Sequence, residues 1–347
     1  MSAPLIIGLT GDILGPDGRP RSWNTGLEQI RATGGRVDYR ILEQFPAELR
    51  PEHVQDVDGI VVSLSKVTRA TFTGVERLTV LARFGVGVDS VDIAACTDAG
   101  VALTITDGAV TTPVAEGIAC YLLALSHNLL RKERMVRENR WREKNRWPGT
   151  ELRDRVVGFV GLGRIARRAL GMLMGFRMAR PCAYDPYVDE ISMAQLGVRK
   201  VDLPELLRTA DFVVITCALT EQTRGLIGAA ELAQMRRDAY LVNVARGPIV
   251  DQDALLAALR EGRIAGAGLD VFVREPTDAS LPFIGLDNVI LTPHAIAMTE
   301  ECIRDMGRMA IRSILDVFEG RRPHGLYNPQ VWERPEFQRK LVGLSTG

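Results

Sequence analysis

This sequence has few cysteines and no surplus of charge of either sign. Its five cysteines are scattered and odd in number, and no spacing among them is typical of a metal site or a disulfide framework. The 43 Lys and Arg residues balance 43 Asp and Glu residues, which gives no global reason to expect a nucleic-acid or membrane-surface partner. We therefore expect reduced thiols in a cytoplasmic protein without bound metal.

The sequence also lacks long apolar runs and internal repeats. No run reaches the roughly 18 residues that a membrane-spanning helix needs. The segment Met1–Asp12 has neither the basic region nor the apolar core of a signal peptide. We therefore expect no membrane association, and the length of 347 residues favours two domains.

The chain is organised around one stretch that combines a glycine-rich turn with two short strands. An apolar run typical of a buried strand leads into the turn, an amphipathic run typical of a helix follows, and a second strand ends on an acid. This order is the fingerprint of a dinucleotide-binding unit. Its parts are strand Val156–Val160, Gly161, Gly163 and Ala166, helix Arg164–Met174, strand Cys182–Tyr184 and Asp185.

Each part of this fingerprint has a physical reason. Gly161 permits the sharp turn, Gly163 lets the backbone approach a pyrophosphate closely, and the new helix directs free N–H groups at the phosphates. Asp185 has the spacing expected of an acid that binds the ribose hydroxyls, and it should repel a 2′-phosphate, which favours NAD over NADP. Arg164 and Arg167 argue the other way, because an arginine near the loop can accommodate that phosphate. A glycine turn without a cofactor is the alternative.

Strands alternate with helices on both sides of this stretch, which predicts a first parallel sheet and then a six-stranded doubly wound domain. The segment Thr10–Ser22, rich in Gly, Pro and Asp, is expected to form an exposed loop near the site. The strands expected before the fingerprint are Pro4–Leu9, Val37–Leu42, Ile60–Ser63 and Leu78–Phe84, with a helix at Thr25–Ala32. Those expected after it are a strand ending at Thr216, strands Tyr240–Val244, Ala265–Val271 and Asn288–His294, and helices Ala229–Met235 and Gln252–Gly262.

Other segments are expected to link or flank the domains. A long, mostly apolar helix, Val114–Leu130, should connect the two domains and pack on the cofactor domain. The next segment, Arg131–Trp147, is strongly charged with interleaved tryptophans, a combination found in nucleic-acid sites. Its acids dilute that interpretation and favour a solvated helix or a subunit-contact arm. Helix Thr299–Glu319 should return to the first domain, and the tail after Asn328 is polar and uninformative.

Glycines bracket an irregular loop at the end of an earlier strand. Gly85 and Gly87 lie on either side of Val86, after the strand expected to end at Phe84. Ligands of open parallel sheets gather outside the carboxyl ends of the strands. Backbone N–H groups freed by such a loop can hold a carboxylate. An ordinary glycine turn is the alternative.

Three polar residues, Arg246, Glu275 and His294, end later strands or follow them, where they should face the cofactor crevice. Reduction of a carbonyl group by hydride needs an acid for the oxygen, and an imidazole titrates near neutrality. Glu275 could hydrogen-bond the histidine and favour its imidazolium form, and the arginine offers a planar fork for a carboxylate. Each residue taken alone could equally be structural: a core histidine, a surface Glu-Pro turn and a salt-bridged arginine.

From about Val80 to Gly320 the sequence resembles the D-isomer-specific 2-hydroxyacid dehydrogenase family. The similar segments occur in the family's order and spacing, which makes the resemblance specific, whereas residues 1–75 match only loosely. The segments are GVGVDSVD, TTPVAE, VVGFVGLGRIARRAL, LTEQTRGLI, LVNVARGPIVD, GAGLDVFVREP and LTPHA.

The resemblance implies an α/β protein with two Rossmann-like domains. A doubly wound parallel-sheet NAD domain, residues 105–296, would be inserted into a flavodoxin-like substrate domain made of residues 1–104 and 297–347. It also implies a homodimer formed largely through the NAD domain, with Trp141 or Trp147 reaching a neighbouring active site. The implied reaction interconverts a small-molecule 2-keto acid and a D-2-hydroxy acid, with NAD expected as the cofactor rather than NADP.

The resemblance further implies roles for individual residues. His294 would be the general acid or base, with Glu275 as its partner and Arg246 as the substrate anchor. Val86 and Gly87 would give backbone N–H groups to the substrate carboxylate. The implied cofactor contacts are Gly161, Gly163, Arg164, Ile165, Asp185, Cys217, Val244, Ala245, Arg246, Asp270, which would receive the nicotinamide carboxamide, and His294.

Some positions depart from the family's pattern or bear on the substrate. The family's common His-x-Pro-Leu-Thr is here Thr216–Thr220, and the usual glycine after His294 is missing from the segment AIAMT. Arg83 stands where phosphoglycerate dehydrogenases have a phosphate-binding basic residue, with an arginine bonded to nearby backbone as the alternative. The candidate substrates are therefore 3-phosphoglycerate, or another acid with a second anionic group, and glyoxylate or hydroxypyruvate. Formate dehydrogenases carry a glutamine at the place of Glu275, which argues against formate.

Two other classes of function compete with this prediction. NAD-sensing corepressors share the fold and the same Arg, Glu and His residues, but this chain has no low-complexity region. A dehydrogenase of other ancestry would need a Tyr-x-x-x-Lys pair or zinc ligands, and neither is visible. A 2-hydroxyacid dehydrogenase is the function that the sequence favours.

Overall fold

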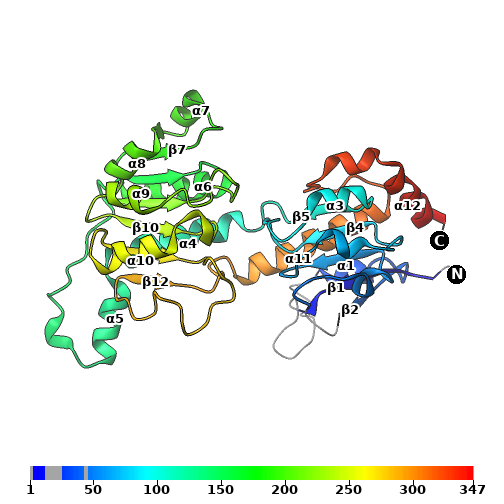
Figure 1. Cartoon of the computed structure of the whole chain (residues 1–347), viewed down its shortest axis with the longest axis horizontal. Helices are drawn as coiled ribbons and strands as arrows, with labels where there is room; N and C mark the ends of the chain where they lie inside the picture. The colour runs from blue at the N-terminus through cyan, green and yellow to red at the C-terminus, as the bar shows by residue number, and fades with distance from the viewer. Residues whose placement is uncertain (1–2, 12–25, 43–45, 347) are drawn as a thin grey trace. The chain divides into compact units, whose positions relative to one another are not determined.

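The computed structural model describes residues 3–11, 26–42 and 46–346, which form two compact units (Figure 1). Unit 1 contains Met1–Val110 and Met298–Gly347, and unit 2 contains Thr111–Ala297. The chain therefore leaves unit 1 once and returns to it once, so that unit 2 is an insertion. Most of the loop expected at Thr10–Ser22 lies outside the described residues.

Unit 1 is built on a five-stranded parallel sheet in the order β2-β1-β3-β4-β5. This is the flavodoxin-like strand order, in keeping with the flavodoxin-like domain that the resemblance implied. The last strand, Ala102–Ile105, was not predicted from the sequence. The strands are β1 (Leu5–Leu9), β2 (Val37–Ile41), β3 (Gly59–Val62), β4 (Val80–Arg83) and β5 (Ala102–Ile105).

Two apolar cores fill the two faces of this sheet. Helix α11 (Glu300–Phe318) packs with α1 (Leu27–Arg31) on one face, and its apolar stripe is buried there. The side chain of Thr299 accepts the N–H of Cys302 and so fixes the start of α11. On the other face lie α2 (Pro51–Val54), η2 (Arg69–Phe72) and α3 (Ile93–Asp98).

The tail after Asn328, for which the sequence pattern made no prediction, is helical. It forms η6 (Pro329–Glu333) and α12 (Pro335–Thr346), and the side chain of Phe337 is fully buried. Buried Asn328 accepts the N–H of Leu103 and donates to the carbonyl of Val101. The tail was missed because these bonds reach residues more than two hundred positions away, which no local pattern reveals.

Unit 2 contains a seven-stranded parallel sheet in the order β12-β11-β10-β9-β6-β7-β8. The sequence predicted six strands; the seventh, β8, has only two residues at the sheet edge and therefore leaves no pattern. The strand order reverses between β6 and β9, which is the switch point of a doubly wound sheet. The strands are β6 (Val157–Val160), β7 (Cys182–Tyr184), β8 (Arg199–Lys200), β9 (Phe212–Ile215), β10 (Tyr240–Asn243), β11 (Gly266–Leu269) and β12 (Val289–Leu291).

Helices cover both faces of the second sheet. One face carries α4 (Thr111–Ser126), α6 (Arg164–Leu173), η4 (Met174–Phe176) and α7 (Glu190–Gln195). The other carries α8 (Leu203–Thr209), α9 (Ala229–Gln234), η5 (Gly247–Ile249) and α10 (Gln252–Arg260). Helix α4 packs closely on α6, as expected for a connecting helix that lies on the cofactor domain.

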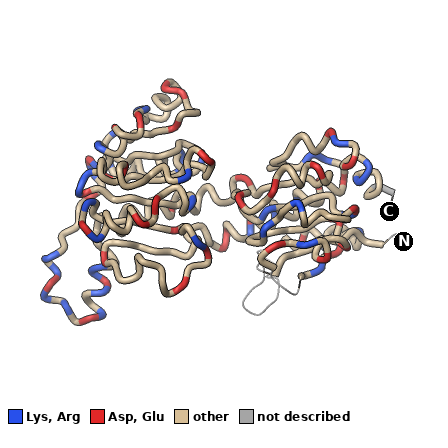
Figure 2. The backbone as a smooth tube through the Cα atoms, viewed as in Figure 1, with Lys and Arg blue, Asp and Glu red and all other residues tan. Residues whose placement is uncertain are grey.

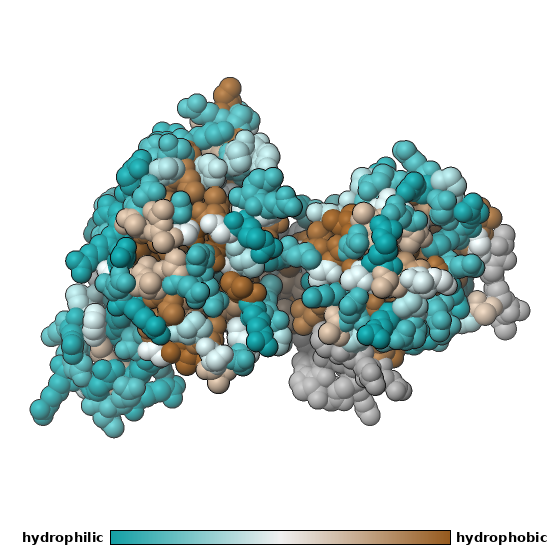
Figure 3. Space-filling view, in the orientation of Figure 1, coloured by the Kyte–Doolittle hydropathy of each residue, from teal (hydrophilic) through white to brown (hydrophobic). Residues whose placement is uncertain are grey.

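The helix expected at Val114–Leu130 is broken rather than continuous. Asn128 has a left-handed φ of 50°, which Asn tolerates, and α5 (Leu129–Arg137) starts after it. With η3 (Trp141–Glu143), α5 forms an arm, residues 129–147, that projects from the body of unit 2 (Figure 1). Acidic and basic residues mix along the arm (Figure 2), and its surface is mostly hydrophilic (Figure 3). This mixture does not favour a nucleic-acid site.

The cysteines of the described residues are free thiols. Cys96, Cys182 and Cys302 are buried, and burial raises the pKa of Cys96 to about 12 and that of Cys302 to about 11. Among the described residues no His, Cys, Asp and Glu side chains gather in a group of three or more that could hold a metal ion. None of the described helices is both long and apolar enough to cross a membrane.

Candidate active site

The polar residues singled out in unit 2 lie on loops that leave the carboxyl ends of its strands. Every paired strand in this sheet is parallel, so these ends meet at one edge. The structure thus brings the expected residues to a single edge. They are Gly161 and Gly163 after β6, Asp185 after β7, Cys217 after β9, Val244, Ala245 and Arg246 after β10, Asp270 and Glu275 after β11, and His294 after β12.

His294 and Glu275 form a direct pair at this edge. Nδ1 of His294 lies 2.7 Å from Oε2 of Glu275, and Oε1 of the same carboxylate accepts the N–H of Phe272 at 2.8 Å. The side chain of His294 is 45 % exposed. Because Nδ1 is occupied, Nε2 is the ring nitrogen that faces outward for a ligand.

The surroundings of Glu275 favour its ionised form. Burial alone would raise its pKa, but the hydrogen bonds from His294 and Phe272, with the charges of His294 and Arg246, outweigh burial. The pKa of Glu275 therefore lies below its ordinary value, and the carboxyl group is an acceptor for the histidine at neutral pH.

Asp270 organises the loop that carries His294. Its Oδ1 accepts the hydroxyl of Thr292 at 2.5 Å and the N–H groups of Ala295 at 2.9 Å and Ile296 at 3.1 Å. Its carbonyl oxygen accepts the N–H of His294 at 2.7 Å. His294 has a left-handed φ of 53°, which is uncommon for a residue other than glycine and is held here by these bonds. Oδ2 of Asp270 takes part in none of these hydrogen bonds among the described residues.

Arg246 is held by the loop after β10. The side chain of buried Asn243 accepts the N–H of Ala245 at 3.0 Å and donates to the carbonyl of Arg246 at 2.9 Å. The next residue must be glycine, because a Cβ on Gly247 would lie 2.0 Å from the carbonyl carbon of Phe272. The loops after β10 and β11 are therefore locked together, which fixes the backbone beneath the Arg246 guanidinium.

The glycine turn after β6 has the shape that a dinucleotide requires. Gly161 has a φ of 93°, and a Cβ there would lie 2.7 Å from the backbone of Cys217. Gly163 is the N-cap of α6 and has no side chain to cap it, and a Cβ built at Gly163 meets no described atom within 4 Å. Open space therefore lies beside the start of the helix, whose first residues are Arg164 and Ile165. This arrangement fits a pyrophosphate.

Asp185 is fixed beside that turn. Its Oδ2 accepts the N–H of Leu162 at 2.8 Å, and its Oδ1 accepts the N–H of Tyr187 at 2.9 Å. Nε of Arg167 donates to the carbonyl of Leu162 at 3.0 Å, so this arginine also supports the turn. Burial raises the pKa of the nearby Cys217 thiol to about 11, which keeps it neutral.

The glycine loop of unit 1 follows β4. Nε of Arg83 donates to the carbonyl of Gly87 at 3.0 Å, and its Nη1 donates to the carbonyl of Phe84 at 2.9 Å. These are the bonds of an arginine that shapes nearby backbone. The N–H groups of Val86 and Gly87 have no acceptor among the described residues. The loop therefore offers two donors for an anionic group.

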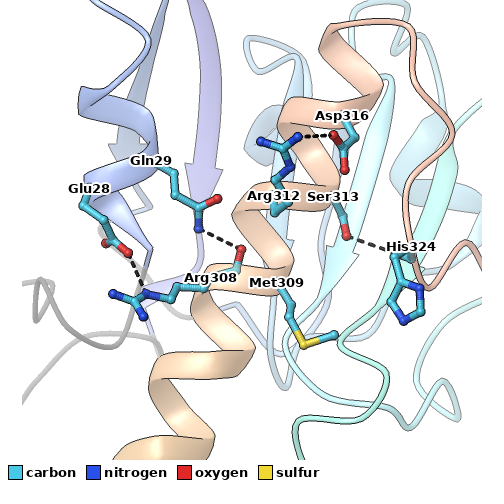
Figure 4. Close-up of a pocket in the computed structure, with 8 residues that line it drawn as sticks. All are labelled: Glu28, Gln29, Arg308, Met309, Arg312, Ser313, Asp316 and His324. Carbon is cyan, nitrogen blue, oxygen red and sulfur yellow. Dashed lines mark hydrogen bonds and ion pairs between the residues drawn. The ribbon is translucent and has the colours of Figure 1, made fainter.

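A cavity of about 410 Å³ lies elsewhere in unit 1, between α1 and α11 (Figure 4). Arg308 pairs with Glu28, and Arg312 pairs with Asp316. The four charges cancel, so this cavity lacks the positive excess that an anionic acid needs. Its lining comes from α1, α11 and the turn at His324 rather than from strand ends, and we place the candidate site at the strand ends.

Sequence reasoning missed three residues that support the site. Asn243 and Thr292 hold the loops of Arg246 and His294, and Tyr121 of α4 lies 2.5 Å from the hydroxyl of Thr292. The one available signal was a tyrosine in an otherwise apolar helix, since a buried hydroxyl needs a partner.

Comparisons with known proteins agree with this geometry. The family model described as D-isomer specific 2-hydroxyacid dehydrogenase, NAD binding domain, matches residues 119–295. A glyoxylate reductase of Korarchaeum cryptofilum is 37% identical over 286 residues, which cover 81% of this chain and 85% of that protein. A D-3-phosphoglycerate dehydrogenase of Methanocaldococcus jannaschii is 37% identical over 279 residues, which cover 80% of this chain but 53% of that protein.

Among solved structures, an NADPH-dependent glyoxylate/hydroxypyruvate reductase of Sinorhizobium meliloti superposes with a TM-score of 0.76. It is 28% identical, and the match covers 91% of this chain and 94% of that one. The family model spans the sheet whose strand ends carry the dinucleotide turn and the His–Glu pair. This chain therefore belongs to the D-isomer specific 2-hydroxyacid dehydrogenase family, oxidoreductases that bind a nicotinamide cofactor.

Proposed function

We propose that this protein interconverts a small 2-keto acid and its D-2-hydroxy acid, with His294 as the proton donor in reduction and the acceptor in oxidation. The observation that carries the proposal is the 2.7 Å contact between His294 and Glu275 at the edge that also holds the glycine turn. Unit 2 would be the cofactor domain and unit 1 the substrate domain.

The pair supports this chemistry in a defined way. Nδ1 of His294 donates to the Glu275 carboxylate, which stabilises the imidazolium and leaves Nε2 to face the substrate. In reduction the Nε2 proton passes to the oxygen on C2 of the acid, and in oxidation Nε2 takes it back. A bound nicotinamide would supply or accept the hydride at C2.

Each unit has a feature that we propose as a binding place for a carboxylate. Arg246 offers its guanidinium on a backbone fixed by Asn243, with Nη1 also donating to the carbonyl of Ala245 at 2.7 Å. In unit 1, the N–H groups of Val86 and Gly87 have no acceptor among the described residues and are proposed as donors to an anion.

We propose NAD as the preferred cofactor. Both oxygens of Asp185 are fixed by backbone N–H groups, so the carboxylate cannot turn away from the place expected for the ribose. It would accept hydrogen bonds from the ribose hydroxyls and repel a 2′-phosphate. Nε of Arg167 is engaged by the carbonyl of Leu162, which weakens its candidacy as a phosphate ligand.

We propose glyoxylate or hydroxypyruvate as the substrate. The similarity to a glyoxylate reductase over most of both chains supports this choice. The bonds from Arg83 to the carbonyls of Phe84 and Gly87 support it as well, because they engage a guanidinium that a substrate phosphate would otherwise use. The phosphorylated acid stays the competing candidate.

We further propose a homodimer formed through unit 2. The arm, residues 129–147, exposes Leu129, Leu130, Val136 and Trp141. Exposed apolar side chains on a projecting, mostly hydrophilic segment favour a protein contact. A second copy of this chain is the proposed partner, in keeping with the resemblance.

The test is NADH consumption by the purified protein with glyoxylate, hydroxypyruvate and 3-phosphohydroxypyruvate, each repeated with NADPH. We expect turnover with one of the first two acids and faster turnover with NADH. Preference for the phosphorylated acid would overturn the substrate assignment. Binding of NADH without reduction of any 2-keto acid would instead favour a NAD-sensing protein of the same fold.

A further inference from the structure

We infer that Tyr121 is a positioning residue: through Thr292 and Asp270 it holds the loop that presents His294. The inference rests on the proposed role of His294 in proton transfer. Tyr121 lies on α4, which precedes the glycine turn in sequence and carries no residue of the expected site.

A chain of hydrogen bonds joins Tyr121 to the loop. The hydroxyl oxygen of Tyr121 lies 2.5 Å from Oγ1 of Thr292, which in turn lies 2.5 Å from Oδ1 of Asp270. A carboxylate accepts, so Thr292 donates to Asp270 and Tyr121 donates to Thr292. Burial raises the pKa of Tyr121 well above its ordinary value, which keeps the phenol protonated and able to donate.

This series of hydrogen bonds ends on Oδ1 of Asp270, which organises the loop of His294. Oδ1 of Asp270 also receives the N–H groups of Ala295 and Ile296, on the C-terminal side of His294. A carboxylate fixed by Tyr121 and Thr292 therefore fixes both amides. This matters because His294 sits at a φ of 53°, a conformation that relaxes once its supporting bonds weaken.

Close packing between α4 and the strand ends supports the same conclusion independently. A Cβ on Gly268 of β11 would lie 2.6 Å from the ring of Tyr121. A Cβ on Gly117, one turn before Tyr121, would lie 2.3 Å from Cγ1 of Ile296. The two glycines therefore leave room for Tyr121 and Ile296, and α4 fits directly against the loop.

The hydroxyl group itself is the informative feature. Tyr121 is 2% exposed, and a phenylalanine would bury the same ring without the need for a partner. A buried hydroxyl is costly unless it is bonded, so its value lies in the bond to Thr292.

The test compares Tyr121→Phe with Tyr240→Phe. Tyr240 is a half-buried tyrosine of the same unit, stacked on Phe212, and its hydroxyl bonds to none of the described residues. We expect Tyr121→Phe to lower kcat by about three- to tenfold, the loss of one hydrogen bond's worth of positioning. Thr292→Val, which removes the bridging hydroxyl, should also lower kcat. Thr292→Ser, which keeps that hydroxyl, and Tyr240→Phe should both keep the wild-type kcat.

A second readout works without substrate or cofactor. The chain has four histidines, so the imidazole nitrogen NMR signals of His294 can be assigned by their loss in His294→Ala. Tyr121→Phe should shift or broaden these signals, because the contact with Glu275 loosens, and Tyr240→Phe should not. If the wild type reduces no 2-keto acid, the proposed function fails while this readout still decides the positioning role.

Two results would overturn the inference. One is an unchanged His294 signal in Tyr121→Phe, even if kcat falls, because the effect would then not pass through the loop. The other is a wild-type kcat in Tyr121→Phe. A lower unfolding temperature alone, without either effect, would reduce Tyr121 to a packing residue.

Discussion

His294 and Glu275 are bonded at 2.7 Å although they follow different strands of the sheet. The carboxylate uses one oxygen for the imidazole and the other for the N–H of Phe272. Glu275 is thereby fixed to its own loop while it orients a ring on the neighbouring one. The properties of this pair lead to the first two predictions.

Removal of the imidazole should abolish proton transfer. His294→Ala is expected to lower kcat by roughly 100- to 10,000-fold, the usual contribution of general acid catalysis. His127→Ala, at an exposed histidine of the same unit, is the control and should keep wild-type turnover. Stopped-flow or steady-state NADH consumption measures both, and a fully active His294→Ala would rule out the assignment.

Neutralising the carboxylate should change the pH profile. The pKa of Glu275 is held below its ordinary value, so the group is charged at neutral pH and favours a protonated partner. Glu275→Gln removes that charge, and the reductive activity should then fall off at lower pH than in the wild type. The pH dependence of kcat for reduction checks this, and superimposable profiles would show that the pair does not act as proposed.

Much of the fold follows from local sequence signals. The strands of unit 2 were predicted because strands buried on both faces are continuous apolar runs. Three features of the fold could not be predicted from local signals. Strand β8 is too short to show a pattern, the break at Asn128 rests on one left-handed residue, and α12 is held by bonds of Asn328 to residues far away in sequence.

The residues of the candidate site also fall into those that the sequence predicted and those that it did not. Arg246, Glu275 and His294 were predicted because each follows a strand of a parallel sheet, where chemistry gathers. Thr292 and Tyr121 were not, because their bond joins residues 171 positions apart and exists only once α4 packs on the sheet. Residues that touch a ligand therefore leave a signal in the sequence, whereas the residues that support them leave little.

The glycine turn should tolerate no side chain at Gly161. Its φ is 93°, and a Cβ would lie 2.7 Å from the backbone of Cys217, so Gly161→Ala must displace the turn. NADH affinity is expected to fall at least tenfold in a fluorescence titration. Gly171→Ala, in the last turn of α6 with no described atom within 4 Å of its Cβ, is the matched control. It should bind NADH normally, and equal affinities in both variants would disprove the role of the turn.

Asp185 should set the choice between the two nicotinamide cofactors. Asp185→Asn keeps a side-chain acceptor for the turn but removes the charge that repels a 2′-phosphate. The ratio of kcat/KM for NADPH to that for NADH should rise about tenfold or more, since one lost charge repulsion is worth more than about 1 kcal/mol at short range. A ratio that stays at the wild-type value would show that another residue selects the cofactor.

Lys340 of α12 should make the free energy of unfolding depend on pH in the alkaline range. Its Nζ donates to the carbonyls of Leu78 and Ala99, and burial lowers its pKa to about 8. The unfolded chain, with a lysine pKa near 10.4, binds more protons between these values, so stability should rise as pH increases from about 8 toward 10.4. The Lys340→Met variant lacks this rise in stability with pH. The difference in free energy of unfolding in favour of the variant should therefore be largest near neutrality and shrink as pH rises. Urea unfolding at several pH values measures the difference, with Lys66→Met, at an exposed lysine of unit 1, as the control. A difference between Lys340→Met and wild type that does not change with pH would mean that Lys340 stays charged in the folded protein.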